Sequence, residues 1–160
     1  MSTTTWRRRT LPNPHRSTRS PAPGNGPAFV DSSGWIAFFS RGDAHHADAS
    51  ALMRAAVDGR TTLLTTNLVV AETQRLLLFR VGTAAASRAL DVFDRSRHLT
   101  IHFSTPADHS AARQWIARLA DLRLTYTDAV SFAAMQSFDC RGFVGFDRDF
   151  DAAGFVRWQP

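Results

Sequence analysis

The sequence contains no lysine, one cysteine, one glutamate and no long uninterrupted apolar run. The single cysteine, Cys140, excludes an internal disulfide and a zinc site built from several cysteines. No apolar run approaches the roughly 18 residues that a membrane span needs, so we expect no membrane partner. The scarcity of cysteine also favours a reducing compartment, and we expect a cytoplasmic location.

The positive charge is concentrated at the start of the chain. Five of the 19 arginines lie within residues 1–26, which contain no acid, so residues 27–160 are formally neutral and the net charge of +5 resides in the first segment. Ser, Thr, Pro, Gly and Arg dominate that segment, which predicts a disordered basic arm. An arm that contacts nucleic acid or a partner, a start codon assigned upstream of the true one, and an organellar transit peptide all remain open.

Residues 27–160 alternate between short apolar runs and helical patterns. The apolar runs predict strands at 28–30, 61–65, 98–103, 142–146 and 155–158. Helices are expected at 34–39, 45–57, 67–79 and 84–94, and from Thr105 and Thr125 onward, with Asn67 as a cap and with Leu90 and Ile116 facing inward. This alternation predicts an α/β fold, a three-layer α/β/α sandwich around a central, mostly parallel sheet.

Four acids stand at positions where such a fold would bring them together. Asp31 and Asp147 follow predicted strands, and Glu72 and Asp128 lie near predicted helix starts. In a parallel α/β fold these places share one edge of the sheet. Two carboxylates 4 Å apart repel by about 4 kcal/mol at an effective dielectric near 20, and a divalent cation removes that repulsion.

Oxygen ligands without histidine or cysteine suit Mg²⁺ or Mn²⁺, and the chemistry expected of such a site is phosphodiester hydrolysis by metal-activated water. Each acid also has a structural interpretation. Asp128 could be a helix cap, Asp147 a turn residue and Glu72 an exposed helix acid. Asp31 is the hardest to explain in that way, because a plain strand-to-helix turn needs no carboxylate after three apolar residues.

Four stretches around these acids resemble the acidic motifs of PIN domains, most closely those of VapC-type toxins from bacterial toxin–antitoxin pairs. They are Ala28-Phe29-Val30-Asp31-Ser32-Ser33, Val69-Val70-Ala71-Glu72-Thr73, Tyr126-Thr127-Asp128-Ala129-Val130-Ser131-Phe132 and Phe146-Asp147-Arg148-Asp149-Phe150. The resemblance covers residues 27–160, which we interpret as one PIN-like nuclease domain. It departs from the family at residues 1–26, since these proteins usually begin almost directly on the first strand.

The resemblance implies a Mg²⁺- or Mn²⁺-dependent endoribonuclease toxin that forms a homodimer and is neutralised by a cognate antitoxin. It assigns catalysis and metal binding to Asp31, Glu72, Asp128 and Asp147, and a further metal-ligand role to Asp149. Ser33 matches a hydroxyl position that supports the site. Arg123 and Arg148 lie near these acids in the sequence and are candidates for binding RNA phosphates, with solvated arginines as the alternative.

Other functions fit less well. A receiver domain or a haloacid-dehalogenase-type phosphatase would need a lysine, and the phosphatase would also need a second aspartate where Ser33 stands. A catalytically silent PIN-like module that binds RNA or protein remains the alternative function. His45 and His46 favour a solvated turn over a metal site, and His98, His102 and His109 are interpreted as structural. We expect Cys140 to be a buried thiol, and Trp35, Trp115 and Trp158 to lie in the core.

Overall fold

The computed structural model describes residues 26–160, so the prediction of a disordered arm over residues 1–26 lies almost wholly outside the described residues. In the described part, five strands alternate with seven helices. The strands are β1 (Ala28–Val30), β2 (Leu63–Thr66), β3 (Leu99–His102), β4 (Gly142–Val144) and β5 (Val156–Arg157). The helices are α1 (Ser32–Phe39), α2 (His46–Asp58), α3 (Asn67–Arg80), α4 (Thr83–Arg95), α5 (Pro106–Arg118), α6 (Tyr126–Ser137) and α7 (Arg148–Ala152). None of these helices is long and apolar enough to cross a membrane.

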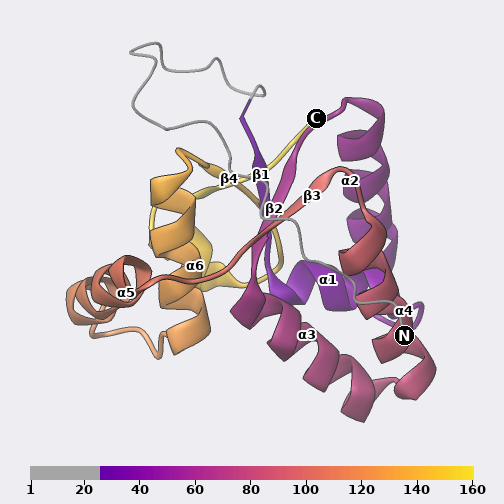
Figure 1. The fold of residues 1–160 in the computed structure, drawn as a ribbon, viewed down its shortest axis with the longest axis horizontal. Coiled ribbons are helices and arrows are strands. Elements are labelled where there is room, and N and C mark those ends of the chain that lie inside the picture. The colour runs from indigo at the N-terminus through magenta and orange to yellow at the C-terminus, as the bar shows by residue number, and fades with distance from the viewer. Residues whose placement is uncertain (1–25) are drawn as a thin grey trace, which may run out of the picture.

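The strands form one sheet in the order β3-β2-β1-β4-β5. Every neighbouring pair is parallel, and the central strand β1 places Ala28 opposite Leu63 of β2 and opposite Gly142 of β4. The carboxyl ends of the strands therefore lie along one edge of the sheet, where α1 and α3 begin (Figure 1).

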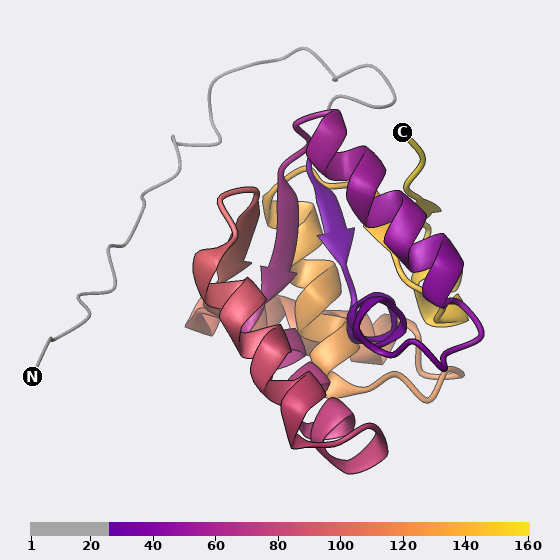
Figure 2. The same ribbon diagram turned by 90° about the vertical axis from the view of Figure 1, so that its right-hand side faces the viewer.

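Helices cover both faces of this sheet. In Figure 1, α5 and α6 lie on one side of the strands, and α1, α2 and α4 lie on the other. Figure 2 shows the second group from the front, with α2 running alongside the strands. The predicted α/β class and the three-layer α/β/α sandwich are confirmed, with a sheet that is parallel throughout its described strands.

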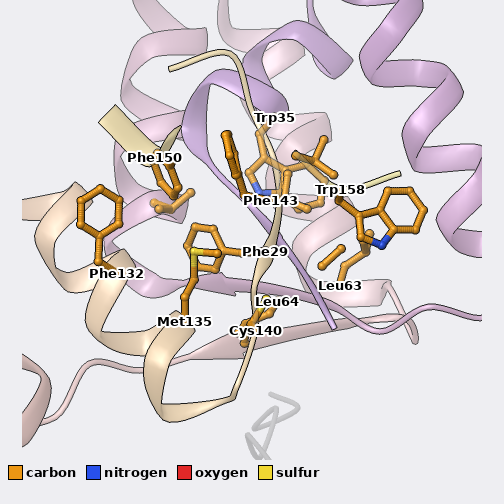
Figure 3. Packing of buried hydrophobic residues seen from close by; sticks show 14 of the residues in the cluster. Phe29, Trp35, Leu63, Leu64, Phe132, Met135, Cys140, Phe143, Phe150 and Trp158 are labelled. Atoms are coloured by element: carbon orange, nitrogen blue, oxygen red, sulfur yellow. The ribbon is translucent and has the colours of Figure 1, made fainter. Parts of the chain in front are cut away.

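The centre of the core is a cluster of phenylalanines that also anchors the last helix. Phe150 of α7 is fully buried, with its ring centroid 4.8 Å from that of Phe143 and 4.9 Å from that of Phe132 (Figure 3). Burying one such side chain stabilises the fold by about 1.5–3 kcal/mol. Phe150 thereby fixes the short α7 against the sheet. The three tryptophans that we expected in the core are all buried there (Trp35, Trp115 and Trp158).

Some local predictions differ from the structure. Thr66, rather than Asn67, caps α3, because its hydroxyl accepts from the Val69 N–H at 3.2 Å. Asn67 is the first helical residue, and its side-chain oxygen accepts from the backbone of Ser104 at 2.9 Å. Leu90 and Ile116 were expected to face inward but are 41% and 37% exposed. Their helices pack on only part of their circumference, so an apolar residue at the margin of the stripe stays in contact with solvent.

The stretch after β4 also differs from the prediction. The strand ends at Val144 rather than at residue 146, and α7 occupies a segment for which the sequence predicted no helix. A helix of five residues is too short to show a helical period in the sequence. Asp147 consequently caps a helix, and Asp151 is an exposed helical residue whose carboxylate forms an ion pair with Arg157 at 2.9 Å.

Candidate active site

Asp31 connects the central strand to the first helix and is almost completely buried. It caps α1, and its Oδ2 accepts from the Ser33 N–H at 3.1 Å and from the Ser33 hydroxyl at 2.8 Å. The carboxylate is 2% exposed, and its Oδ1 has no hydrogen-bond partner among the described residues. Burying a carboxylate oxygen without a partner costs free energy. We therefore expect Asp31 Oδ1 to contact a cation or a hydrogen-bond donor from outside the chain.

Ser33 also links Asp31 to the segment that carries Asp147. Its Oγ accepts from the Phe146 N–H at 2.9 Å, so one hydroxyl contacts both acid-bearing loops. Gly145 makes this approach possible, since a Cβ at that position would lie 3.2 Å from the Asp31 Cβ and 3.2 Å from the Ser33 Oγ. Asp147 then caps α7, and its Oδ1 accepts from the Asp149 N–H at 2.9 Å.

Asp128 enters from α6 through a capping box. The Thr125 hydroxyl and backbone N–H donate to Asp128 Oδ2 at 2.5 and 3.1 Å, and the Asp128 N–H donates to the Thr125 Oγ1 at 3.2 Å. The structural interpretation of Asp128 is thus correct as far as it goes. Because all the cap bonds to the carboxylate use Oδ2, Oδ1 stays available for a second role.

The structure brings three of the predicted ligands into a tight group. Asp128, Asp147 and Asp149 each offer a carboxylate oxygen, and these oxygens lie within 4.8 Å of one another. Asp31 and Glu72 are outside that group but close enough to interact electrostatically with its carboxylates. The negative charges of Asp128 and Asp147 help to raise the pKa of Glu72, and that of Asp31 helps to raise the pKa of Asp128.

Burial is the main cause of the pKa shifts of Asp31, Glu72, Asp128 and Asp149. It raises the pKa of Asp31 and of Glu72, and it raises the pKa of Asp128 to about 6, while hydrogen bonds from Ser33, Ser32 and Thr125 respectively oppose the change. The pKa of Asp149 is also raised, by burial and by the charge of Asp147. Without a metal ion, burial and the mutual repulsion of the carboxylates therefore disfavour their ionised forms at this edge of the sheet.

A divalent cation fits this arrangement. The donors are carboxylate oxygens with no histidine or cysteine among them, which is the ligand chemistry of hard ions. The unpartnered Oδ1 of Asp31 and the grouped oxygens of Asp128, Asp147 and Asp149 are the atoms that an ion would satisfy. These residues can thus hold a metal ion and, through it, a phosphate group.

The two arginines suggested as RNA ligands are exposed. Arg148 is the first residue of α7, and Arg123 lies in the loop before α6. Neither forms an ion pair with any residue from 26 to 160. Their guanidinium groups are free for a phosphate, and their role stays a prediction.

The histidines and the cysteine behave in different ways. The ring of His102 contacts the buried Asp108 at 2.8 Å, which fits the structural interpretation, and Cys140 is buried with its thiol donating to the carbonyl oxygen of Pro27. His45, interpreted as a solvated turn residue, is exposed but stacks on Phe146. Sequence reasoning missed this pairing, and the one available signal was an aromatic residue directly before Asp147.

Known proteins resemble this chain in sequence and in fold. The PIN domain family profile matches residues 28–156. A protein of Mycobacterium tuberculosis named 23S rRNA-specific endonuclease VapC20 is 35% identical over 136 residues, which cover 82% of this chain and 98% of that protein. A VapC ribonuclease of Archaeoglobus fulgidus is 31% identical over 106 residues, which cover 65% of this chain and 67% of that protein.

A solved structure agrees with these sequence matches. The crystal structure of M. tuberculosis VapC20, described as a sarcin–ricin loop cleaving toxin, superposes with a TM-score of 0.76 at 33% identity and covers 83% of this chain and 99% of that one. The fold and the acidic edge define a PIN domain. The chain belongs to the PIN-domain family and, within it, to the VapC-type ribonuclease toxins.

Proposed function

We propose that this protein is an endoribonuclease toxin that depends on Mg²⁺ or Mn²⁺ and cleaves RNA phosphodiester bonds at the acidic edge of its sheet. The observation that carries the proposal is the convergence of Asp128, Asp147 and Asp149 beside the buried, partly unpaired carboxylate of Asp31. The names of the relatives favour ribosomal RNA of the large subunit, and the sarcin–ricin loop within it, as the substrate.

Each acid of the site would have a role in binding the metal ion. Asp128, Asp147 and Asp149 hold the ion together with Asp31, and Glu72 adds negative charge beside them. When bound, the ion supplies positive charge to the phosphate oxygens and lowers the pKa of a water for in-line attack.

Several neighbours would keep these ligands in place. Ser33 orients Asp31, and Thr125 orients Asp128 by occupying its Oδ2. The exposed guanidinium groups of Arg123 and Arg148 bind neighbouring phosphates of the RNA and so set the position of the RNA strand in the site.

We also propose a homodimer and a cognate antitoxin, on the basis of family membership. The described surface offers apolar area for protein partners, since Phe79 is 77% and Val81 is 45% exposed at the end of α3. Light scattering of the purified protein should give twice the mass of the chain. Co-expression with a cognate antitoxin should give a complex in which cleavage is suppressed.

Cleavage of total cellular RNA by the purified full chain, free of antitoxin, tests the nuclease itself. With Mg²⁺ or Mn²⁺ we expect discrete fragments, whose ends identify the substrate, and with EDTA we expect none. Asp128→Asn should reduce cleavage by at least about 100-fold, while the matched control Asp121→Asn, an exposed loop aspartate, should leave it unchanged. Cleavage that survives EDTA or Asp128→Asn would refute the proposal, and RNA binding without any cleavage would favour the silent binding module.

A further inference from the structure

Two pairs of parallel rings involve residues of the acidic motifs. The ring of His45, at the start of α2, lies on that of Phe146 with centroids 4.0 Å apart and planes 9° from parallel. The rings of His109 of α5 and Tyr126 have centroids 5.6 Å apart and planes 6° from parallel, and they meet edge to edge because the Tyr126 hydroxyl contacts His109 Nδ1. In each pair one ring belongs to an acidic motif, because Phe146 directly precedes Asp147 and Tyr126 stands two residues before Asp128.

In each pair the outer ring is open to solvent and the other ring supports it. His45 is exposed above the half-buried Phe146, whose backbone N–H is held by the Ser33 Oγ. Tyr126 is 44% exposed, and its hydroxyl is hydrogen-bonded to Nδ1 of the half-buried His109. His45 thus presents a flat ring that Phe146 supports on one face, and Tyr126 presents a flat ring that His109 holds at its hydroxyl edge.

The two ring pairs involve helices from opposite layers of the sandwich. His45 comes from the layer of α1 and α2, whereas His109 and Tyr126 come from the layer of α5 and α6 (Figure 1). Asp128 and Asp147, which adjoin the two ring pairs in the sequence, offer oxygens within 4.8 Å of each other. The convergence of these two acids brings the two ring-bearing segments to the same edge of the sheet.

We propose that the outer rings, His45 and Tyr126, are platforms on which two unpaired bases of the substrate RNA stack, one on each side of the scissile phosphate. This inference rests on the proposed ribonuclease function and adds to it a specificity device. Proteins recognise single-stranded RNA by stacking unpaired bases on aromatic rings, which every base permits. Bases held on two separated platforms are splayed apart, so the phosphate between them faces the carboxylates, and a paired duplex does not fit.

Steady-state cleavage of a synthetic RNA that spans the cleavage site mapped with the wild-type chain tests the platforms. His45→Ala and Tyr126→Ala should each reduce kcat/KM by roughly 5- to 150-fold, mainly through KM, because a stacked base contributes about that factor to binding. Tyr126→Phe keeps the ring and should stay within a few fold of wild type. His98→Ala, at the opposite edge of the sheet where β3 begins, is the matched control and should change nothing.

A second measurement does not depend on any variant being well folded. Replacing the nucleotide on either side of the cleaved bond by an abasic one should slow the wild-type chain by a similar factor. On the abasic RNA, Tyr126→Ala or His45→Ala should then cause no further loss, because the stacking partner is already absent.

The outcomes separate this inference from the function on which it rests. A wild-type chain that cleaves, with variants within twofold of it or with losses that multiply on the abasic RNA, would overturn the platforms and leave the nuclease intact. A wild-type chain that cleaves no RNA would overturn both.

Discussion

At the scale of single residues, Ser33 holds the candidate site together. Its hydroxyl donates to Asp31 Oδ2 and accepts from the Phe146 N–H, so it joins the end of β1 to the loop that carries Asp147. Ser33→Ala removes both bonds and leaves a buried carboxylate with one donor fewer.

We expect Ser33→Ala to weaken Mn²⁺ binding by about 10- to 100-fold, the usual effect of removing a group that orients a metal ligand. Titration calorimetry of the full chain with Mn²⁺ measures the change. Ser110→Ala is the control, because the Ser110 hydroxyl bonds only to the Pro106 carbonyl on the exposed surface of α5. An unchanged affinity in Ser33→Ala would remove Ser33 from the site.

At the scale of elements, the closest packing near the site is that of α1 against β4. A Cβ at Gly34 would lie 2.5 Å from the carbonyl oxygen of Val144, a backbone atom that cannot move without disturbing the strand. The first turn of α1 is therefore held directly against the strand that leads to Asp147.

Gly34→Ala should destabilise the protein by about 1–3 kcal/mol, and it should also weaken Mn²⁺ binding because α1 carries Ser33 in its first turn. Urea unfolding and calorimetry measure the two effects. Gly42→Ala has open space around the added methyl group and should change neither. Normal metal binding in a destabilised Gly34→Ala chain would show that the site tolerates a shift of α1.

The elements differ in how far they can be predicted from the sequence. The strands and the six longer helices follow from short apolar runs and helical periods, and the acids of the site follow from their places at strand ends and helix starts. The exposure of Leu90 and Ile116 does not follow, because a period shows which residues share a face and not how much of that face is covered. The contact between His45 and Phe146 depends on tertiary packing between distant segments, which no local pattern records.

At the scale of the whole molecule, the acidic edge makes stability depend on pH. The pKa of Asp128 is raised from 3.8 to about 6, and those of Asp31 and Glu72 are raised as well. A group whose pKa is higher in the folded state binds more protons when folded, so the free energy of unfolding falls as the pH rises through this range. The metal-free protein should therefore be more stable near pH 4.5 than near pH 7.5, with Asp128 alone contributing roughly 2 kcal/mol over that interval.

Thermal unfolding in EDTA at the two pH values measures this difference, and Asp128→Asn should reduce it. Saturating Mn²⁺ should raise the melting temperature at pH 7.5, since ion at about 100 times its Kd adds about 2.7 kcal/mol. The lowered pKa of Asp108 acts below pH 4 and in the opposite direction, so it does not obscure the effect. A melting temperature that is unaffected by Mn²⁺ would count against the metal site.

The charge distribution suggests that residues 27–160 carry out catalysis and that the basic first segment contributes to RNA binding. We predict that a chain of residues 27–160 folds and cleaves RNA with the kcat of the full chain, because all the site residues lie within it. Its cleavage should respond less to salt, because the five arginines of the first segment are absent and the remainder is formally neutral. Loss of folding in the shortened chain would make the first segment part of the domain.

The pairing of β1 with β4 has a consequence for synthesis of the protein. Translation produces Asp31 long before Asp147 and Asp149, and β1 lacks its β4 neighbour until residues 142–144 have been made. An unfinished chain thus has neither the complete acidic group nor the strand that positions it. The acidic group can therefore assemble only after β4 and α7 have been synthesised, so a shorter nascent chain lacks the metal site proposed above.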